Sequence, residues 1–140
     1  MNLMLRLKCV FGKIKIGRAV FIGKNVIIED GVEIGDGTVI KNNVEIRRGT
    51  KIGSKCYIDS GVKTSGNCVI GDGVTLRYDV IIARGCFIGD GSYIAPRVMT
   101  NNLSHNEISV GGAKVGNNCF VGTNTVLNHG VEIGDNVTIG

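Results

Sequence analysis

The stretch that decides the fold is residues 20–46, which read VFIGKNVIIEDGVEIGDGTVIKNNVEI. An aliphatic residue returns at every sixth position of this stretch: Ile22, Ile28, Ile34, Ile40 and Ile46. Each unit, such as Val20-Phe21-Ile22, alternates inward, outward and inward as a short β-strand does. The positions between the units are rich in Gly, Asn and Asp, which tolerate the left-handed backbone of tight turns.

The repeat extends over most of the 140 residues. The sixth-residue series runs from Ile16 to Ile94, with Thr64 as its one polar member, and returns from Val115 to Ile139. A short strand and a tight turn every six residues close a triangular coil of 18 residues, and coils stack about 4.8 Å apart through backbone hydrogen bonds. We therefore predict an all-β solenoid over residues 16–140, preceded by an N-terminal cap segment, residues 1–15, that includes the amphipathic stretch 1–11.

The repeat loses register between Thr100 and Val115. Nine extra residues, 106–114, are predicted to leave the solenoid as a side loop, and such loops often carry function in repeat proteins. His105 comes just before this loop, at what the periodicity predicts to be an outward position in line with Phe87 and Glu132. The core does not need a histidine there, which makes His105 a candidate catalytic residue.

This periodicity resembles the bacterial hexapeptide transferase family, and the resemblance covers nearly the whole chain. It implies a left-handed parallel β-helix, whereas the general rule for parallel crossovers favours right-handed ones. The segment Tyr93-Ile94-Ala95-Pro96-Arg97-Val98, with His105 nine residues after Pro96, is similar to the maltose and galactoside O-acetyltransferase branch. The resemblance therefore implies an acetyltransferase that uses acetyl-CoA.

The same resemblance implies roles for four residues, and two further residues are candidates for contact with the acceptor. His105 would be the general base, because an imidazole with a pKa of about 6.5 can take the proton of a sugar hydroxyl as its oxygen attacks a thioester. Phe120, Gly122 and Thr123 are the candidates for binding the pantetheine arm of coenzyme A, and Asn101 and Asn102 for binding the acceptor. A backbone N–H of Gly122 or Thr123 would hold the thioester oxygen as it gains charge.

Some positions depart from that branch, and two alternatives stay open. Phe120 replaces the usual Trp, His129 the usual Pro, and Thr75 falls where an acceptor-binding Asn is expected. The run Thr100–Leu103 is similar to sugar-nucleotide 3-N-acetyltransferases, so N-acetylation of an amino sugar nucleotide is the first alternative, and a non-catalytic β-helix scaffold is the second. The presence of His105 favours a hydroxyl acceptor, since a neutral amine is already nucleophilic and does not need a base there. The expected product is an O-acetylated sugar of a surface polysaccharide or of its precursor.

Composition limits the partners. The net charge of +4 is spread evenly, which suits an anionic small molecule better than nucleic acid. Two histidines are too few for the three-imidazole zinc site of the carbonic anhydrases in this family, so no metal is expected. No apolar run reaches the roughly 18 residues of a transmembrane segment. The family implies a cytoplasmic protein, in which the cysteines at small inward positions would be free thiols: Cys56, Cys68, Cys86 and Cys119.

Outward residues that are 18 positions apart should line one face of the prism. One such column carries no charge and has four of the seven Phe and Tyr residues: Phe21, Val39, Tyr57, Thr75, Tyr93 and, past the loop, Phe120. An exposed apolar stripe usually marks a partner surface. Together with the resemblance, this column predicts a homotrimer whose active sites are shared between subunits.

Overall fold

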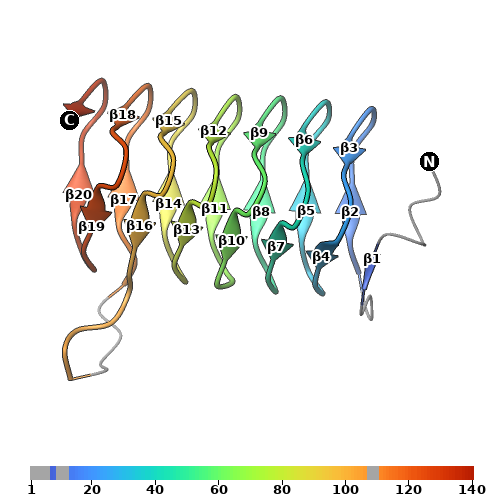
Figure 1. The fold of residues 1–140 in the computed structure, drawn as a ribbon, viewed down its shortest axis with the longest axis horizontal. Helices are drawn as coiled ribbons and strands as arrows, with labels where there is room; N and C mark the ends of the chain where they lie inside the picture. The colour runs from blue at the N-terminus through green and yellow to red at the C-terminus, as the bar shows by residue number, and fades with distance from the viewer. Residues whose placement is uncertain (1–6, 9–12, 107–110) are drawn as a thin grey trace.

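The computed structural model describes residues 7–8, 13–106 and 111–140, and only the backbone of residues 7–8. These residues form strands of two or three residues and no helix, so none of them belongs to a helix that could span a membrane. Figure 1 shows the strands stacked in successive coils from the N-terminal to the C-terminal end of a prism. The fold is the expected left-handed parallel β-helix, with about seven coils.

Every third strand joins the same parallel sheet, so the prism has three faces. Sheet A contains β1 (Leu7–Lys8), β4 (Val26–Ile28), β7 (Glu45–Ile46), β10 (Lys63–Thr64), β13 (Ile81–Ile82), β16 (Met99–Thr100) and β19 (Val126–Leu127). Sheet B contains β2 (Lys15–Ile16), β5 (Glu33–Ile34), β8 (Lys51–Ile52), β11 (Val69–Ile70), β14 (Phe87–Ile88), β17 (Lys114–Val115) and β20 (Glu132–Ile133). Sheet C contains β3 (Phe21–Ile22), β6 (Val39–Ile40), β9 (Tyr57–Ile58), β12 (Thr75–Leu76), β15 (Tyr93–Ile94), β18 (Phe120–Val121) and β21 (Thr138–Ile139).

The pairing register confirms the 18-residue coil before the break. Tyr57 pairs with Val39 on one side and with Thr75 on the other, each 18 residues away. The chain of pairs continues through Tyr93 to Phe120, so the predicted apolar column lies on sheet C. Its aromatic rings point outward, because the alternate residues fill the core.

The core is the column of inward aliphatic residues. Ile22, Ile28, Ile40, Ile58 and Ile88 are each at most 1% exposed. Thr64, the polar member of the series, is also buried, at 3% exposure. Its Oγ1 accepts the backbone N–H of Arg47 at 3.1 Å and pairs with Thr50 Oγ1 at 3.2 Å. The buried hydroxyl thus has the partners that a polar group in a core requires.

The turn glycines serve two different purposes. Gly73 has a φ of +65°, the left-handed conformation expected from the sequence, and a Cβ there would meet no atom within 4 Å. Gly71 is needed because the next coil comes close: a Cβ there would lie 2.2 Å from Asp90 Oδ1. That oxygen accepts the Asp72 N–H at 2.8 Å and so ties two coils together. The sequence alone did not separate the two roles.

We expect Gly71→Ala to destabilise the protein more than Gly73→Ala. The first change displaces the Asp90 carboxylate and overpacks the corner, at a combined cost of about 2–4 kcal/mol. The second only forces alanine into the left-handed region, at about 1–2 kcal/mol. Urea unfolding followed by circular dichroism measures both. A loss of free energy for Gly73→Ala that equals or exceeds that for Gly71→Ala would show that the contact with Asp90 does not matter.

The break in the repeat begins earlier than predicted. Phe87 pairs with Lys114, 27 rather than 18 residues away, which confirms nine extra residues. Asn101 N–H still bonds to Leu127 in the ladder, and the Gly111 carbonyl already accepts Gly130 N–H as part of the next coil. The inserted residues are therefore 102–110, not 106–114; residues 107–110 lie outside the described part of the chain, as do residues 1–6 and 9–12 of the predicted cap.

The predicted position of His105 in the sheet B column is wrong. Lys114 takes that place, where it pairs with both Phe87 and Glu132. The error arose because counting by six continued through Thr100, although the chain leaves the coil directly after Asn101.

Candidate functional site

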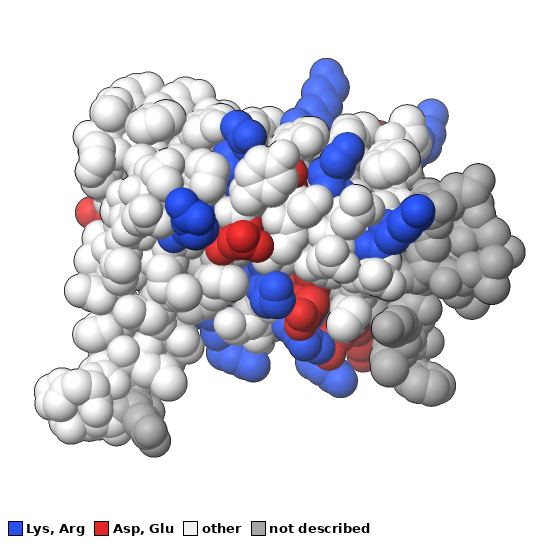
Figure 2. All heavy atoms as spheres, viewed as in Figure 1, with Lys and Arg blue, Asp and Glu red and all other residues white. Residues whose placement is uncertain are grey.

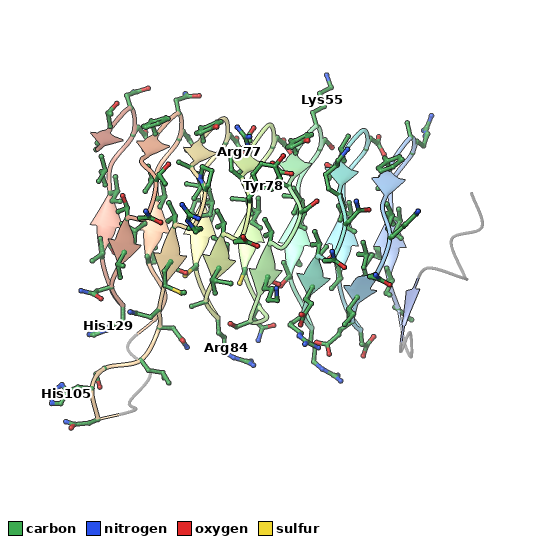
Figure 3. All side chains as sticks on the ribbon, in the orientation of Figure 1. Lys55, Arg77, Tyr78, Arg84, His105 and His129 are labelled. Carbon is green, nitrogen blue, oxygen red and sulfur yellow. The ribbon has the colours of Figure 1, made fainter. Side chains whose placement is uncertain are left out.

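His105 lies in a turn of the inserted loop and is exposed to solvent. Figure 3 shows it on the loop, away from the body of the prism. It has no hydrogen bond or ion pair with any residue that the structure describes. The imidazole therefore has no part in holding the described fold together.

Asn101 fixes the base of the loop. Its Oδ1 accepts the backbone N–H of His129 at 2.7 Å, and its Nδ2 donates to Asn128 Oδ1 at 3.2 Å. This side chain, a candidate for acceptor binding, already holds the corner between two coils. Asn102, the other candidate, is half-buried at the start of the inserted segment.

Phe120 lies on sheet C with 42% of its surface exposed. Its ring stacks on Tyr93, with centroids 5.4 Å apart and planes 7° from parallel. The exposed face of this stack is available to an apolar partner, either the pantetheine arm or another protein surface.

A charged network lies beside this aromatic stack and was not predicted. Asp59 is only 2% exposed, and its Oδ2 accepts the Nε–H of Arg77 at 3.1 Å. Arg77 also donates to the Tyr93 hydroxyl at 2.6 Å and lies over the ring of Tyr78. The hydrogen bond to Asp59 raises the pKa of the Arg77 guanidinium. Asp59 and Arg77 are 18 residues apart, and this spacing could have revealed the pair.

Gly122 and Thr123 follow β18 at the corner between sheets C and A. The Gly122 N–H donates to the Ile139 carbonyl at 2.7 Å as part of the ladder. It is therefore not free to hold a thioester oxygen, which corrects that part of the prediction. Thr123, the other candidate donor of that prediction, is exposed at the same corner.

A single chain does not bring all the predicted residues together. The loop of His105 leaves the corner between sheets A and B, where Asn101 also lies. Phe120 lies on sheet C, and Thr123 lies at a different corner of the prism. The candidate base and the candidate pantetheine contacts are thus on different sides of one chain.

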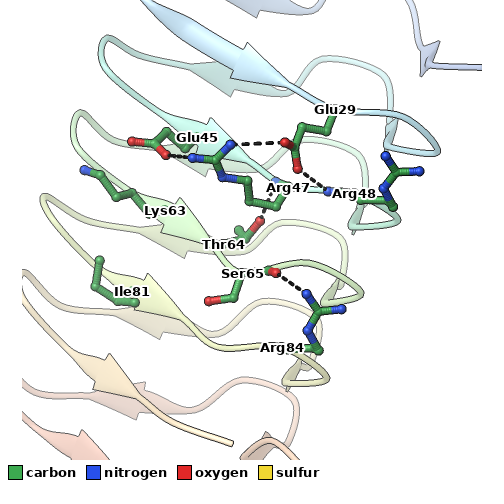
Figure 4. Close-up of a pocket in the computed structure, with 9 residues that line it drawn as sticks. All are labelled: Glu29, Glu45, Arg47, Arg48, Lys63, Thr64, Ser65, Ile81 and Arg84. Carbon is green, nitrogen blue, oxygen red and sulfur yellow. Dashed lines mark hydrogen bonds and ion pairs between the residues drawn. The ribbon is translucent and has the colours of Figure 1, made fainter. Parts of the chain in front are cut away.

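A concave surface of about 520 Å³ lies on sheet A and at the corner between sheets A and B. The sequence did not predict it. Figure 4 shows its lining: Glu29, Glu45, Arg47, Arg48, Lys63, Thr64, Ser65, Ile81 and Arg84. We call it the basic groove, because it has four cationic and two anionic side chains.

Two carboxylates of the basic groove are bound to Arg47. Glu29 lies 3.1 Å from its guanidinium, and Glu45 bonds to another nitrogen of the same group. The hydrogen bond to Glu29 raises the pKa of Arg47. The pKa of Glu29 is lowered, first by the backbone N–H of Arg48, which donates at 2.9 Å.

The repeats match the bacterial transferase hexapeptide family (six repeats) at residues 13–48, 49–84 and 112–140. The chain belongs to this family. Galactoside O-acetyltransferase of Escherichia coli (strain K12) is 40% identical to this chain in an alignment 62 residues long, which covers 38% of this chain and 30% of that protein. The chain thus matches less than a third of the length of its curated relative.

Solved structures of other proteins share the fold of this chain. A putative acetyltransferase of Bacillus cereus is 22% identical, with a TM-score of 0.81 over 95% of this chain and 77% of that one. A hexapeptide-repeat acetyltransferase of Vibrio cholerae is 18% identical, with a TM-score of 0.54 over 86% of this chain and 68% of that one. At these identities the similarity concerns the β-helix itself.

The four cysteines that the structure describes are packing residues. Cys56, Cys68, Cys86 and Cys119 are all buried, as their inward positions predicted. Burial raises the pKa of the Cys68 thiol to about 11, which disfavours the nucleophilic thiolate. Within residues 13–106 and 111–140, no three His, Cys, Asp or Glu side chains are grouped closely enough to hold a metal ion.

Proposed function

We propose that this hexapeptide transferase moves the acetyl group of acetyl-CoA to a sugar hydroxyl in the cytoplasm, on a surface polysaccharide or its precursor. The observation that carries the proposal is the position of His105: it is exposed on a loop that the repeat ejects, and it has no structural partner among the described residues. A stacking or capping role would need such partners. The relative whose name records O-acetylation of a galactoside supports the reaction class.

In the proposed reaction, the His105 imidazole accepts the proton of the sugar hydroxyl while the oxygen attacks the thioester carbonyl. A C–O bond forms, and the Thr123 N–H stabilises the negative oxygen of the tetrahedral intermediate. The C–S bond then breaks, and the imidazolium returns its proton to the departing thiolate. The products are an acetyl ester and free coenzyme A.

We propose that the complete site forms between subunits of a homotrimer. One chain holds His105 and Phe120 on different sides, so a neighbouring copy is required to face the histidine with the pantetheine contacts. The N-terminal part of the sheet C column supplies a surface for this assembly: Phe21 is 47% exposed and Tyr57 38%. These apolar side chains would be covered in the trimer.

Charging this column should break the trimer. We expect the unmodified protein to sediment as a trimer, and the variant Phe21→Glu with Tyr57→Glu to sediment as a folded monomer of 14.8 kDa. The matched control is Val69→Glu on sheet B, which changes another exposed apolar side chain and should leave the trimer intact. A monomeric unmodified protein at micromolar concentration would contradict the trimer, and a trimer that survives both charges would contradict the interface.

A screen of sugar acceptors with acetyl-CoA tests the reaction. Release of coenzyme A thiol, followed with a chromogenic disulfide, should rise above the rate without acceptor for at least one hydroxyl sugar. Calorimetric titration of acetyl-CoA should show binding in the same preparation. Absence of binding would favour the non-catalytic scaffold and overturn the proposal.

A further inference from the structure

The basic groove has more positive charge than its own carboxylates neutralise. Glu29 and Glu45 are both engaged with Arg47. Arg48 reaches Asp30 only at 3.5 Å, and 76% of its side chain remains exposed. Among the described residues, Lys63 and Arg84 have no carboxylate partner at all.

The two unmatched cations are nevertheless held in place. Arg84 Nη2 donates to the Ser65 carbonyl at 3.3 Å, and Lys63 Nζ donates to the Gly61 carbonyl at 3.2 Å. Each of these bonds uses a single N–H, so the other donors of both groups remain available to a ligand. Carbonyl oxygens orient the cations without cancelling their charge.

Gly66 keeps the groove open between coils. The equivalent positions on the two adjacent coils carry Arg48 and Arg84. A Cβ at Gly66 would lie 3.1 Å from the Arg48 carbonyl and 3.7 Å from Arg84 Nη2. Its φ of +115° also departs from the other turn glycines of this corner, such as Gly49 at +72°. A side chain here would press on the Arg48 carbonyl and approach the Arg84 guanidinium.

The groove follows the corner that carries the His105 loop. Ala83 and Arg84 occupy the corner positions one coil before Asn101, after which the loop begins. Figure 3 shows Arg84 at the edge of the prism from which the loop of His105 extends. A ligand held in the groove would therefore lie at the edge that carries the loop.

We propose that the basic groove binds the phosphate or pyrophosphate group of a phosphorylated sugar acceptor; this inference rests on the function proposed above. Guanidinium groups bind phosphate oxygens through paired N–H donors, and a lysine ammonium adds a point charge. The groove volume of about 520 Å³ lies within the usual range for small-molecule sites. The acceptor is thus a sugar phosphate or a nucleotide sugar rather than a neutral glycoside.

Binding of inorganic pyrophosphate tests the groove without reference to catalysis. Titration calorimetry should show saturable binding at low salt, weakened by added NaCl. The double variant Lys63→Gln with Arg84→Gln should raise the Kd for pyrophosphate at least tenfold. The control Lys55→Gln removes the charge of an exposed lysine on the opposite edge in Figure 3 and should leave the Kd unchanged. No binding, or equal effects of both variants, would overturn the proposal.

The kinetics of acetyl transfer then show whether the phosphate bound in the groove belongs to the acceptor or to coenzyme A. With a sugar 1-phosphate or a nucleotide sugar as acceptor, the double variant should raise the KM for the acceptor at least tenfold. The acceptor whose KM rises more belongs to the class of the natural substrate. Transfer to the neutral sugar and the KM for acetyl-CoA should not change. A rise in the KM for acetyl-CoA alone would assign the groove to coenzyme A and contradict the proposal. Failure of all transfer with intact pyrophosphate binding would contradict the proposed function but leave the anion site standing.

Discussion

Replacing His105 by alanine is expected to lower kcat by about 10²–10⁴-fold, the usual contribution of a general base. The fold should not change, because His105 is exposed and makes no contact that holds the described coils together. Steady-state thiol release measures kcat, and circular dichroism checks that the fold is retained.

The control for this experiment is Asn106→Ala, which alters the neighbouring exposed side chain of the same loop. It should retain the kcat of the unmodified protein. If the His105→Ala protein has the same kcat as the unmodified protein, His105 is not the general base. A loss of kcat well below a hundredfold would instead fit an amine acceptor, which needs less help from a base.

Ile58→Asp is expected to prevent folding. Ile58 is 1% exposed and stacks between Ile40 and Leu76 on the adjacent coils. The change removes about 2–3 kcal/mol of apolar burial and adds the penalty of an unpaired buried carboxylate, which is several kcal/mol. The sum is comparable with the whole stability of an ordinary domain, about 5–15 kcal/mol. Circular dichroism should show the β-sheet signal lost.

The adjacent residues supply the controls. Tyr57→Ser alters an outward side chain and should retain the β-sheet signal, although it should weaken the proposed trimer. Asp59 shows that a carboxylate is tolerated one position later, where it bonds to Arg77 and to the Ser60 N–H. A folded Ile58→Asp protein with a normal unfolding temperature would mean that the inward and outward positions are wrongly assigned.

The fold was predictable because each coil repeats the same short pattern. The spacing of Ile22, Ile28 and Ile34 sets the strands, and the pairing of Tyr57 with Val39 and Thr75 confirms the register that it predicted. Periodicity failed only where the chain leaves the coil, at Asn102. The six-residue pattern does not show where the chain leaves the coil, because Thr100 occupies an inward position whether the next residues continue the coil or form the inserted loop.

The candidate site was only partly predictable. A histidine beside a broken repeat is visible in the sequence, and the structure places His105 on the inserted loop. The groove was missed because its members, such as Arg48, Lys63 and Arg84, come together by stacking of coils. The Gly122 N–H is occupied by the Ile139 carbonyl through the pairing of coils, and residue types alone do not reveal this hydrogen bond.

Whether the acetyl group is transferred to oxygen can be decided by characterising the product. Acetyl-CoA labelled in its acetyl group is incubated with the protein and a sugar phosphate that has both a hydroxyl and an amine. We predict a labelled oxygen ester, which hydroxylamine cleaves under mild conditions, and its disappearance in the His105→Ala protein. A labelled amide that resists hydroxylamine, or no labelled sugar at all, would contradict O-acetylation by this chain.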